Sequence, residues 1–105
     1  MTALFPASPD TVATTQASTA HTDFSIASAT GSSQSILAAN VDRREAILHN
    51  FSDKDWWINP TGGTAAVNTA GNVRIPKSGG TLVLNNTNAI TGIGTTGKAL
   101  TVLEG

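Results

Sequence analysis

The chain has 105 residues, a formal net charge of −1, 12% charged residues and no cysteine. This length fits one small domain, and the missing cysteines exclude disulfides and thiolate chemistry. The nearly neutral charge offers no basic field for nucleic acid or for an acidic membrane surface. The opening MTALFPASPD has no positive residue and no apolar run, so we expect no secretory signal and a protein that is soluble and intracellular when made. No apolar run is long enough to span a bilayer.

Residues 1–33 predict an extended N-terminal arm. They are dominated by Ala, Ser and Thr and show neither a helical nor an alternating period. Such a segment has too little apolar surface to form a core of its own. We expect it to lie across a neighbouring subunit, with docking on its own domain as the alternative. Its expected anchors are the isolated apolar residues Leu4, Phe5, Val12, Phe24 and Ile26.

Residues 34–105 predict a β-sandwich domain, because short apolar runs alternate there with turn residues. With strands of this length and number, a sandwich is the natural way to cover one apolar face with another. The fold class we predict is therefore all-β, a small antiparallel β-sandwich of jelly-roll-like topology that follows the arm. The expected strands are residues 35–39, 45–51, 55–59, 64–67, 72–75, 81–85, 89–93 and 99–104.

Alternation within these runs predicts which side chains face the core. The expected inward pairs are Val73 with Ile75, Leu82 with Leu84, and Leu100 with Val102. Val83 and Leu103 point the other way, where they can meet a neighbour. The connectors SDKD, NPTGG, NTAGN, PKSGG and GTTGK carry turn residues, and their glycines supply the positive φ of tight hairpin turns.

Two adjacent tryptophans, Trp56 and Trp57, stand in the run DWWIN. Neighbouring strand residues point to opposite faces, so at most one of them enters the core and the other is exposed or covered by a partner. The outward tryptophan can anchor a subunit contact or stack on a sugar ring. Subunit contact is the expected role, and the position of this tryptophan at a boundary or on a free surface distinguishes the two.

Arg43 and Arg44 form the one concentrated positive charge of the sequence. They can pair with acidic groups of a partner subunit. The ordinary alternative is a solvated entrance to the following strand.

The stretch GIGTTGKAL, from Gly92 to Leu100, has the G-x-G-x-x-G spacing and a lysine, Lys98, after its last glycine. A phosphate-binding loop needs a helix directly after the glycines. Only seven residues follow Lys98, and β-branched Thr101 and Val102 favour a strand. We therefore predict a glycine-rich hairpin turn and no bound nucleotide.

Catalytic or metal-binding groups are not evident either. His21 and His49 stand apart from other candidate ligands, so we expect packing or hydrogen-bonding roles for them. Asp53 and Asp55 lie in the SDKD turn, where short acidic side chains usually accept hydrogen bonds from backbone N–H groups. We expect no enzyme activity, no cofactor and no metal.

The run SILAANVDRREAILHNFSDKDWWINPTGGTAAVNTAGNVRIPKSGGTLVL, followed after a spacer by GKALTVLEG, resembles small virion structural proteins of tailed bacteriophages. The shared features are an "AAN…R…I.N.S" opening, a "G.TAA" segment, a turn of the "I.PGG" type and a C-terminal strand. The resemblance covers Ser35 to Gly105 and leaves the arm unmatched. PKSGG departs from the turn pattern, because Lys77 and Ser78 precede its glycines.

This resemblance implies a capsid cement or decoration protein on the surface of the virion, made in the host cytoplasm. The implied partners are the major capsid protein and further copies of the chain in a homotrimer, with no nucleic acid and no membrane. The partner-binding residues that we expect from the residues themselves are the arm anchors, Arg43, Arg44, Trp56 and Trp57. A head-to-tail adaptor, a tail component and a glycan-binding module on the virion surface are the alternatives.

Overall fold

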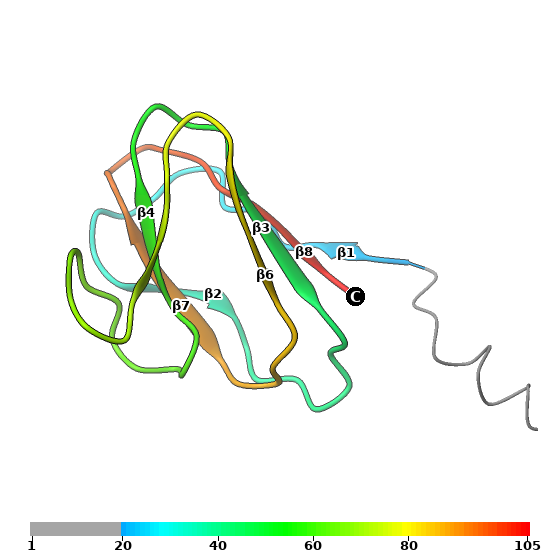
Figure 1. Cartoon of the computed structure of the whole chain (residues 1–105). Helices are drawn as coiled ribbons and strands as arrows, with labels where there is room; N and C mark the ends of the chain where they lie inside the picture. Colours follow the sequence, from blue (N-terminus) through cyan, green and yellow to red (C-terminus); the bar gives the residue numbers. More distant parts are fainter. Residues whose placement is uncertain (1–19) are drawn as a thin grey trace, which may run out of the picture.

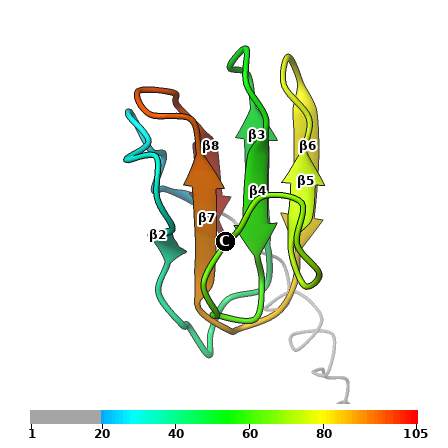
Figure 2. The ribbon, with the colours of Figure 1, turned by 90° about the vertical axis from the view of Figure 1, so that its left-hand side faces the viewer.

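The computed structural model describes residues 20–105, which form two antiparallel four-stranded sheets and contain no helix. The strand order is β1-β8-β3-β6 in one sheet and β2-β7-β4-β5 in the other. The two sheets pack face to face (Figures 1 and 2), which confirms the predicted all-β sandwich. The strands are β1 (Thr22–Asp23), β2 (Gln34–Leu37), β3 (Ala46–Asn50), β4 (Trp56–Asn59), β5 (Val73–Ile75), β6 (Gly80–Leu84), β7 (Ile90–Gly94) and β8 (Thr101–Glu104).

The strand pairs are nested within one another. β4 pairs with β5, β3 with β6, β2 with β7 and β1 with β8, all antiparallel. The chain is therefore a two-stranded ribbon that is closed at the connection between β4 and β5. Pairing of β3 with β8 and of β4 with β7 rolls this ribbon into the sandwich. Eight strands in this order form a jelly roll, so the expected topology is confirmed.

Residues 20–33 belong to the sandwich and not to a separate arm. β1 pairs with the end of β8, Ile26 forms a bridge to Leu100, and Ala29 is buried in the core. Backbone pairing with β8 does not require alternating apolar residues in residues 20–33. The sequence pattern therefore did not predict that these residues join the sheet. The expected boundary after residue 33 is therefore corrected, and these residues dock on their own domain. The expected anchors Leu4, Phe5 and Val12 lie outside the described residues.

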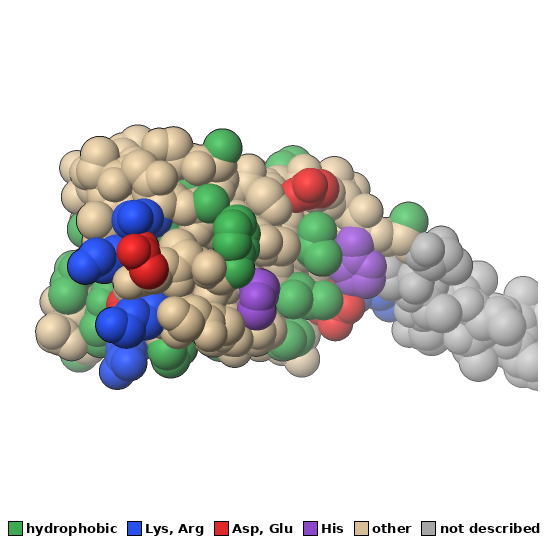
Figure 3. Space-filling model, turned by 90° about the horizontal axis from the view of Figure 1, so that it is seen from above, with side chains coloured by type: hydrophobic (Ala, Val, Ile, Leu, Met, Phe, Trp, Pro, Cys, Tyr) green, Lys and Arg blue, Asp and Glu red, His purple; other side chains and the backbone are tan. Residues whose placement is uncertain are grey.

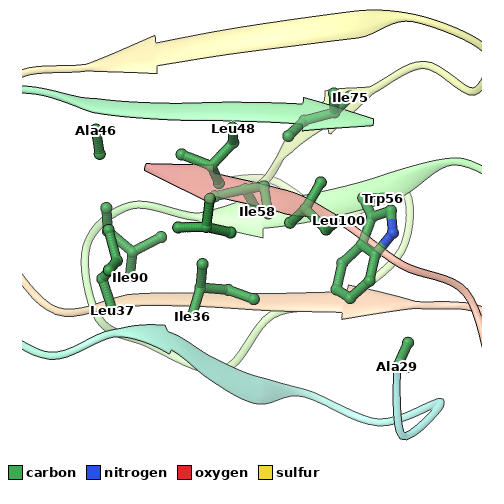
Figure 4. Packing of buried hydrophobic residues seen from close by; sticks show 11 residues of the cluster. Ala29, Ile36, Leu37, Ala46, Leu48, Trp56, Ile58, Ile75, Ile90 and Leu100 are labelled. Carbon is green, nitrogen blue, oxygen red and sulfur yellow. The ribbon is translucent and has the colours of Figure 1, made fainter. Parts of the chain in front are cut away.

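The core lies between the two sheets, and its side chains converge there in Figure 4. Leu100 and Val102 are fully buried, and Leu82 and Leu84 pack against the same cluster. Val73 differs from expectation, because 39% of it is exposed. It shares the inner face with its partner Ile58, but β5 is an edge strand, so Val73 has a neighbouring strand on only one side within residues 20–105. The buried cluster is Ala29, Ile36, Leu37, Ala46, Leu48, Trp56, Ile58, Ile75, Ile90, Leu100 and Val102.

Residues 64–67 were expected as a strand but lie in the long connection between β4 and β5. The backbone N–H of Ala65 donates to Ser33 Oγ, and that of Ala66 donates to Asn72 Oδ1. Side chains thus satisfy the donors that a strand would give to its neighbour. The connection is ordered by these bonds without joining a sheet.

Most connections cross from one sheet to the other. Within residues 20–105, only β4 and β5 are both consecutive in the chain and neighbours in one sheet. The expected hairpin turns at SDKD, PKSGG and GTTGK are therefore corrected to inter-sheet turns. Positive φ at Gly79 and Gly97 confirms the conformational role of their glycines.

Candidate functional site

The described arm anchors contact their own domain. The N–H of Phe24 donates to the Val102 carbonyl at 2.8 Å, and its side chain remains 44% exposed. Ile26 packs against the core cluster. Ile26 is only partly buried, so the partner-binding roles of Ile26 and Phe24 both stay predictions.

Arg43 is buried, with its side chain 0% exposed. Its Nε donates to Glu104 Oε2 at 2.7 Å, and its Nη1 donates to the carbonyls of Asn86 and Asn88. Nη2 donates to the Ala38 carbonyl at 2.7 Å. The guanidinium thus ties two loops to β8 and is not a surface contact. Arg44 is exposed, and its backbone N–H donates to the Gly105 carbonyl, so its partner-binding role stays a prediction.

The tryptophan pair divides as alternation requires. Trp56 is fully buried, and its Nε1 donates to the Ala99 carbonyl at 3.0 Å. It therefore cannot bind a partner, which corrects that expectation. Trp57 is half-buried on the outer face of β4, between Arg74 of β5 and Ile93 of β7.

The glycines of GIGTTGK serve packing as well as turning. A Cβ on Gly94 would lie 2.6 Å from the indole of Trp56, and one on Gly92 would lie 3.0 Å from Ile36 and from Ile58. The two positions lie within β7, and no helix follows them. Nζ of Lys98 lies 2.9 Å from Asp53 Oδ1, so its charge is directed at a neighbouring turn.

We expect Lys98→Ala to raise the pKa of Asp53 toward its ordinary value. The hydrogen bond from Lys98, followed by its charge, holds this pKa down. A lowered folded-state pKa stabilises the fold above the unfolded pKa, and this contribution is lost as pH falls through the folded pKa. Parent and variant should therefore differ slightly at neutral pH and converge in acid, since Asp53 is mostly exposed. NMR titration of the carboxyl measures the shift, and ATP or NAD binding that Lys98→Ala abolishes would contradict the turn interpretation.

An apolar row crosses the outer face of the β1-β8-β3-β6 sheet. Ile47 lies directly opposite Leu103 on one side and Val83 on the other, so the three side chains share this face. Val83 is 57% exposed. The prediction that Val83 and Leu103 point outward is confirmed, and we call these three residues the outer apolar row. Ile47 was not predicted to belong to this row, although the inward position of its neighbour Leu48 places it outward.

The two histidines make hydrogen bonds, as expected, and His49 lies on this same face, two residues along β3 from Ile47. His49 Nδ1 lies 2.8 Å from Thr81 Oγ1, and His21 Nε2 lies 2.7 Å from Glu45 Oε2. Figure 3 shows hydrophobic side chains exposed beside the histidines. In residues 20–105, no three His, Asp or Glu side chains gather closely enough to hold a metal ion.

Basic side chains gather at the end of the sandwich where β3–β4, β5–β6 and β7–β8 connect, and Figure 3 shows them around acidic ones. Ion pairs of Lys98 with Asp53 and of Arg74 with Asp55 neutralise part of this charge. The basic residues are Lys54, Arg74, Lys77 and Lys98.

A depression of about 390 Å³ opens on the outer face of the other sheet. Trp57 and Ile93 line it from β4 and β7, and Val67 lines it from the long connection between β4 and β5. Lys54 and Asp55 line it from the charged end. We call it the Trp57 depression, and its remaining lining residues are Gly31, Gly94, Thr95 and Thr96.

No family model, curated protein or solved structure matches this chain. Among the described residues, no helix is long and apolar enough to cross a membrane.

Proposed function

We propose that the chain is a non-enzymatic structural protein of a tailed-bacteriophage virion, a cement or decoration protein that binds the major capsid protein. The resemblance of Ser35 to Gly105 to such proteins supports this proposal. The jelly roll is compatible with it, because viral capsid domains use this fold. Lectins and cupins use it too, so the fold alone does not carry the function.

The outer apolar row is the observation that carries the proposal. The solvent-facing side of an antiparallel sheet normally bears polar residues. Here Leu103, Ile47 and Val83 follow one another across β8, β3 and β6. Neighbouring apolar side chains on the outer face of a sheet can form the apolar centre of a contact with another protein. We assign the contact with the capsid protein to this row.

The arm that would cross a neighbouring subunit is now confined to residues 1–19, because β1 and Ile26 pair with the chain at β8 and Ala29 enters the core. Leu4, Phe5 and Val12 are its apolar residues. Burial of each on a neighbouring subunit would contribute about 1–3 kcal/mol. The segment would add affinity to that of the sandwich and link subunits, in a trimer or between capsid proteins.

Deletion of residues 1–19 is expected to leave the thermal midpoint unchanged and to weaken particle binding by about tenfold or more, since 1.4 kcal/mol is a factor of ten. Binding is measured by co-sedimentation with particles that lack the protein, and reinforcement by the temperature at which the loaded particles break. Deletion of residues 1–30 is expected to lower the midpoint as well, because it removes β1, Ile26 and Ala29.

Val83→Asp provides the matching test of the outer apolar row, with Val41→Asp as a control at an exposed valine outside the sheets. Val83→Asp should reduce particle binding, and Val41→Asp should not. The cement proposal is wrong if two variants, the chain without residues 1–19 and Val83→Asp, both bind particles and reinforce them as the parent does. A cryo-EM reconstruction of the particle separates a head position from a head-to-tail adaptor or a tail component.

A further inference from the structure

The Trp57 depression differs from the outer apolar row in shape and chemistry. It is concave, because the connection between β4 and β5 stands out in front of the sheet (Figures 1 and 2) and brings Val67 to one wall. Its volume of about 390 Å³ lies within the range of small-molecule sites.

The floor of the depression is an indole beside an aliphatic side chain. Trp57 and Ile93 are cross-strand partners on adjacent strands, β4 and β7. Trp56 is buried on the inner face of β4. Because neighbouring strand residues point to opposite faces, Trp57 points outward. The lining of the depression therefore includes an indole and an aliphatic side chain that two paired strands hold in place.

The rim carries a carboxylate that is already held in place. Asp55 Oδ1 accepts a hydrogen bond from the Lys77 backbone N–H at 2.8 Å, and Asp55 Oδ2 lies 3.2 Å from Arg74 Nε. An ionised carboxylate has about four acceptor positions, so these contacts leave acceptor capacity for a ligand. Lys54 lines the same depression and adds donors.

We propose that the Trp57 depression binds a carbohydrate, with one pyranose ring stacked on the indole of Trp57. The C–H face of a pyranose is apolar and its edge carries hydroxyls, which matches an apolar floor beneath a polar rim. Its hydroxyls donate to Asp55 and accept from Lys54. This inference does not depend on capsid binding, which we assign to the opposite sheet.

The proposal is tested on the full chain with cellohexaose, maltohexaose, chitohexaose and oligogalacturonate, and with an array of bacterial surface polysaccharides. Calorimetry measures the affinity of each soluble probe. Trp56 is fully buried, so a change in tryptophan fluorescence on binding reports on Trp57. We expect saturable binding to at least one neutral or anionic glycan. If the parent prefers oligogalacturonate and this preference is smaller in Lys54→Ala, the carboxylate of the bound sugar lies beside Lys54.

Trp57→Ala is expected to weaken this binding by about tenfold or more, as truncation of a central tryptophan does. Trp57→Phe should retain part of the affinity, and Val83→Asp, on the other sheet, should retain all of it. Circular dichroism establishes that each variant is folded. The proposal is overturned if no probe and no arrayed glycan binds, or if Trp57→Ala binds as the parent does. Loss of particle binding in Trp57→Ala, with glycan binding unchanged, would instead assign Trp57 to a subunit contact.

Discussion

Arg43→Ala is expected to destabilise the domain by about 3–5 kcal/mol, the usual cost of removing one partner of a buried ion pair. The change leaves the Glu104 carboxylate and the carbonyls of Ala38, Asn86 and Asn88 without their donor. Proteins of this size are stable by only about 5–15 kcal/mol. The variant should therefore be largely unfolded at temperatures that the parent tolerates.

Urea denaturation followed by circular dichroism measures this loss. Arg43→Lys keeps the charge but lacks the planar fork of donors, so it should recover only part of the stability. Lys77→Ala removes an exposed basic side chain and should change stability by no more than about 0.5 kcal/mol. If Arg43→Ala behaves like Lys77→Ala, the buried network does not hold the two loops to β8.

Trp56→Ala is expected to cost about 3–5 kcal/mol, as truncation of a core tryptophan does. The indole fills the space left by Gly94 in β7, and its Nε1 donates to the Ala99 carbonyl. Trp57→Ala, one residue further along β4, should cost about 1 kcal/mol, because the side chain is half-buried on the outer face. The two variants therefore compare the stability lost on the inner face of β4 with that lost on its outer face.

Thermal melts of the two variants provide the measurement, and Trp56→Phe should fall between Trp56→Ala and the parent. A larger loss in Trp57→Ala than in Trp56→Ala would mean that β4 faces the other way. This would also remove Trp57 from the depression and with it the floor of the proposed sugar site. The stability test is therefore a prerequisite for interpreting the binding test.

Local patterns predicted the sandwich, because residues 34–105 contain short runs of alternating apolar and polar residues that are separated by turn residues. Leu100, Val102 and Ile75 are buried and Val83 is exposed, as their positions in the alternating runs require. The tryptophan pair followed the same rule. In each of these cases, the identity of neighbouring residues decides which face a side chain takes.

Features set by distant parts of the chain were not predictable from local patterns. β1 has two residues and no period, and it is a strand because β8 offers an edge. Arg43 was expected at the surface, but Glu104 and carbonyls of two loops surround it. Alternation places Val73 on the inner face, but it is exposed because β5 is an edge strand. The Trp57 depression likewise needs walls from separate segments.

The nested pairing of the ribbon also constrains how the domain assembles. The β4–β5 pair closes the shortest stretch of chain, and the β1–β8 pair encloses the longest, from Thr22 to Glu104. Loop closure costs more entropy as the enclosed chain lengthens, and pairings between distant residues slow folding. Each inner pair shortens the loop that the next must close, so we expect the favoured route to run outward from the β4–β5 connection. The segment adjoining residues 1–19 is then the last to join the sheet, after the surfaces with the outer apolar row and Trp57 have formed.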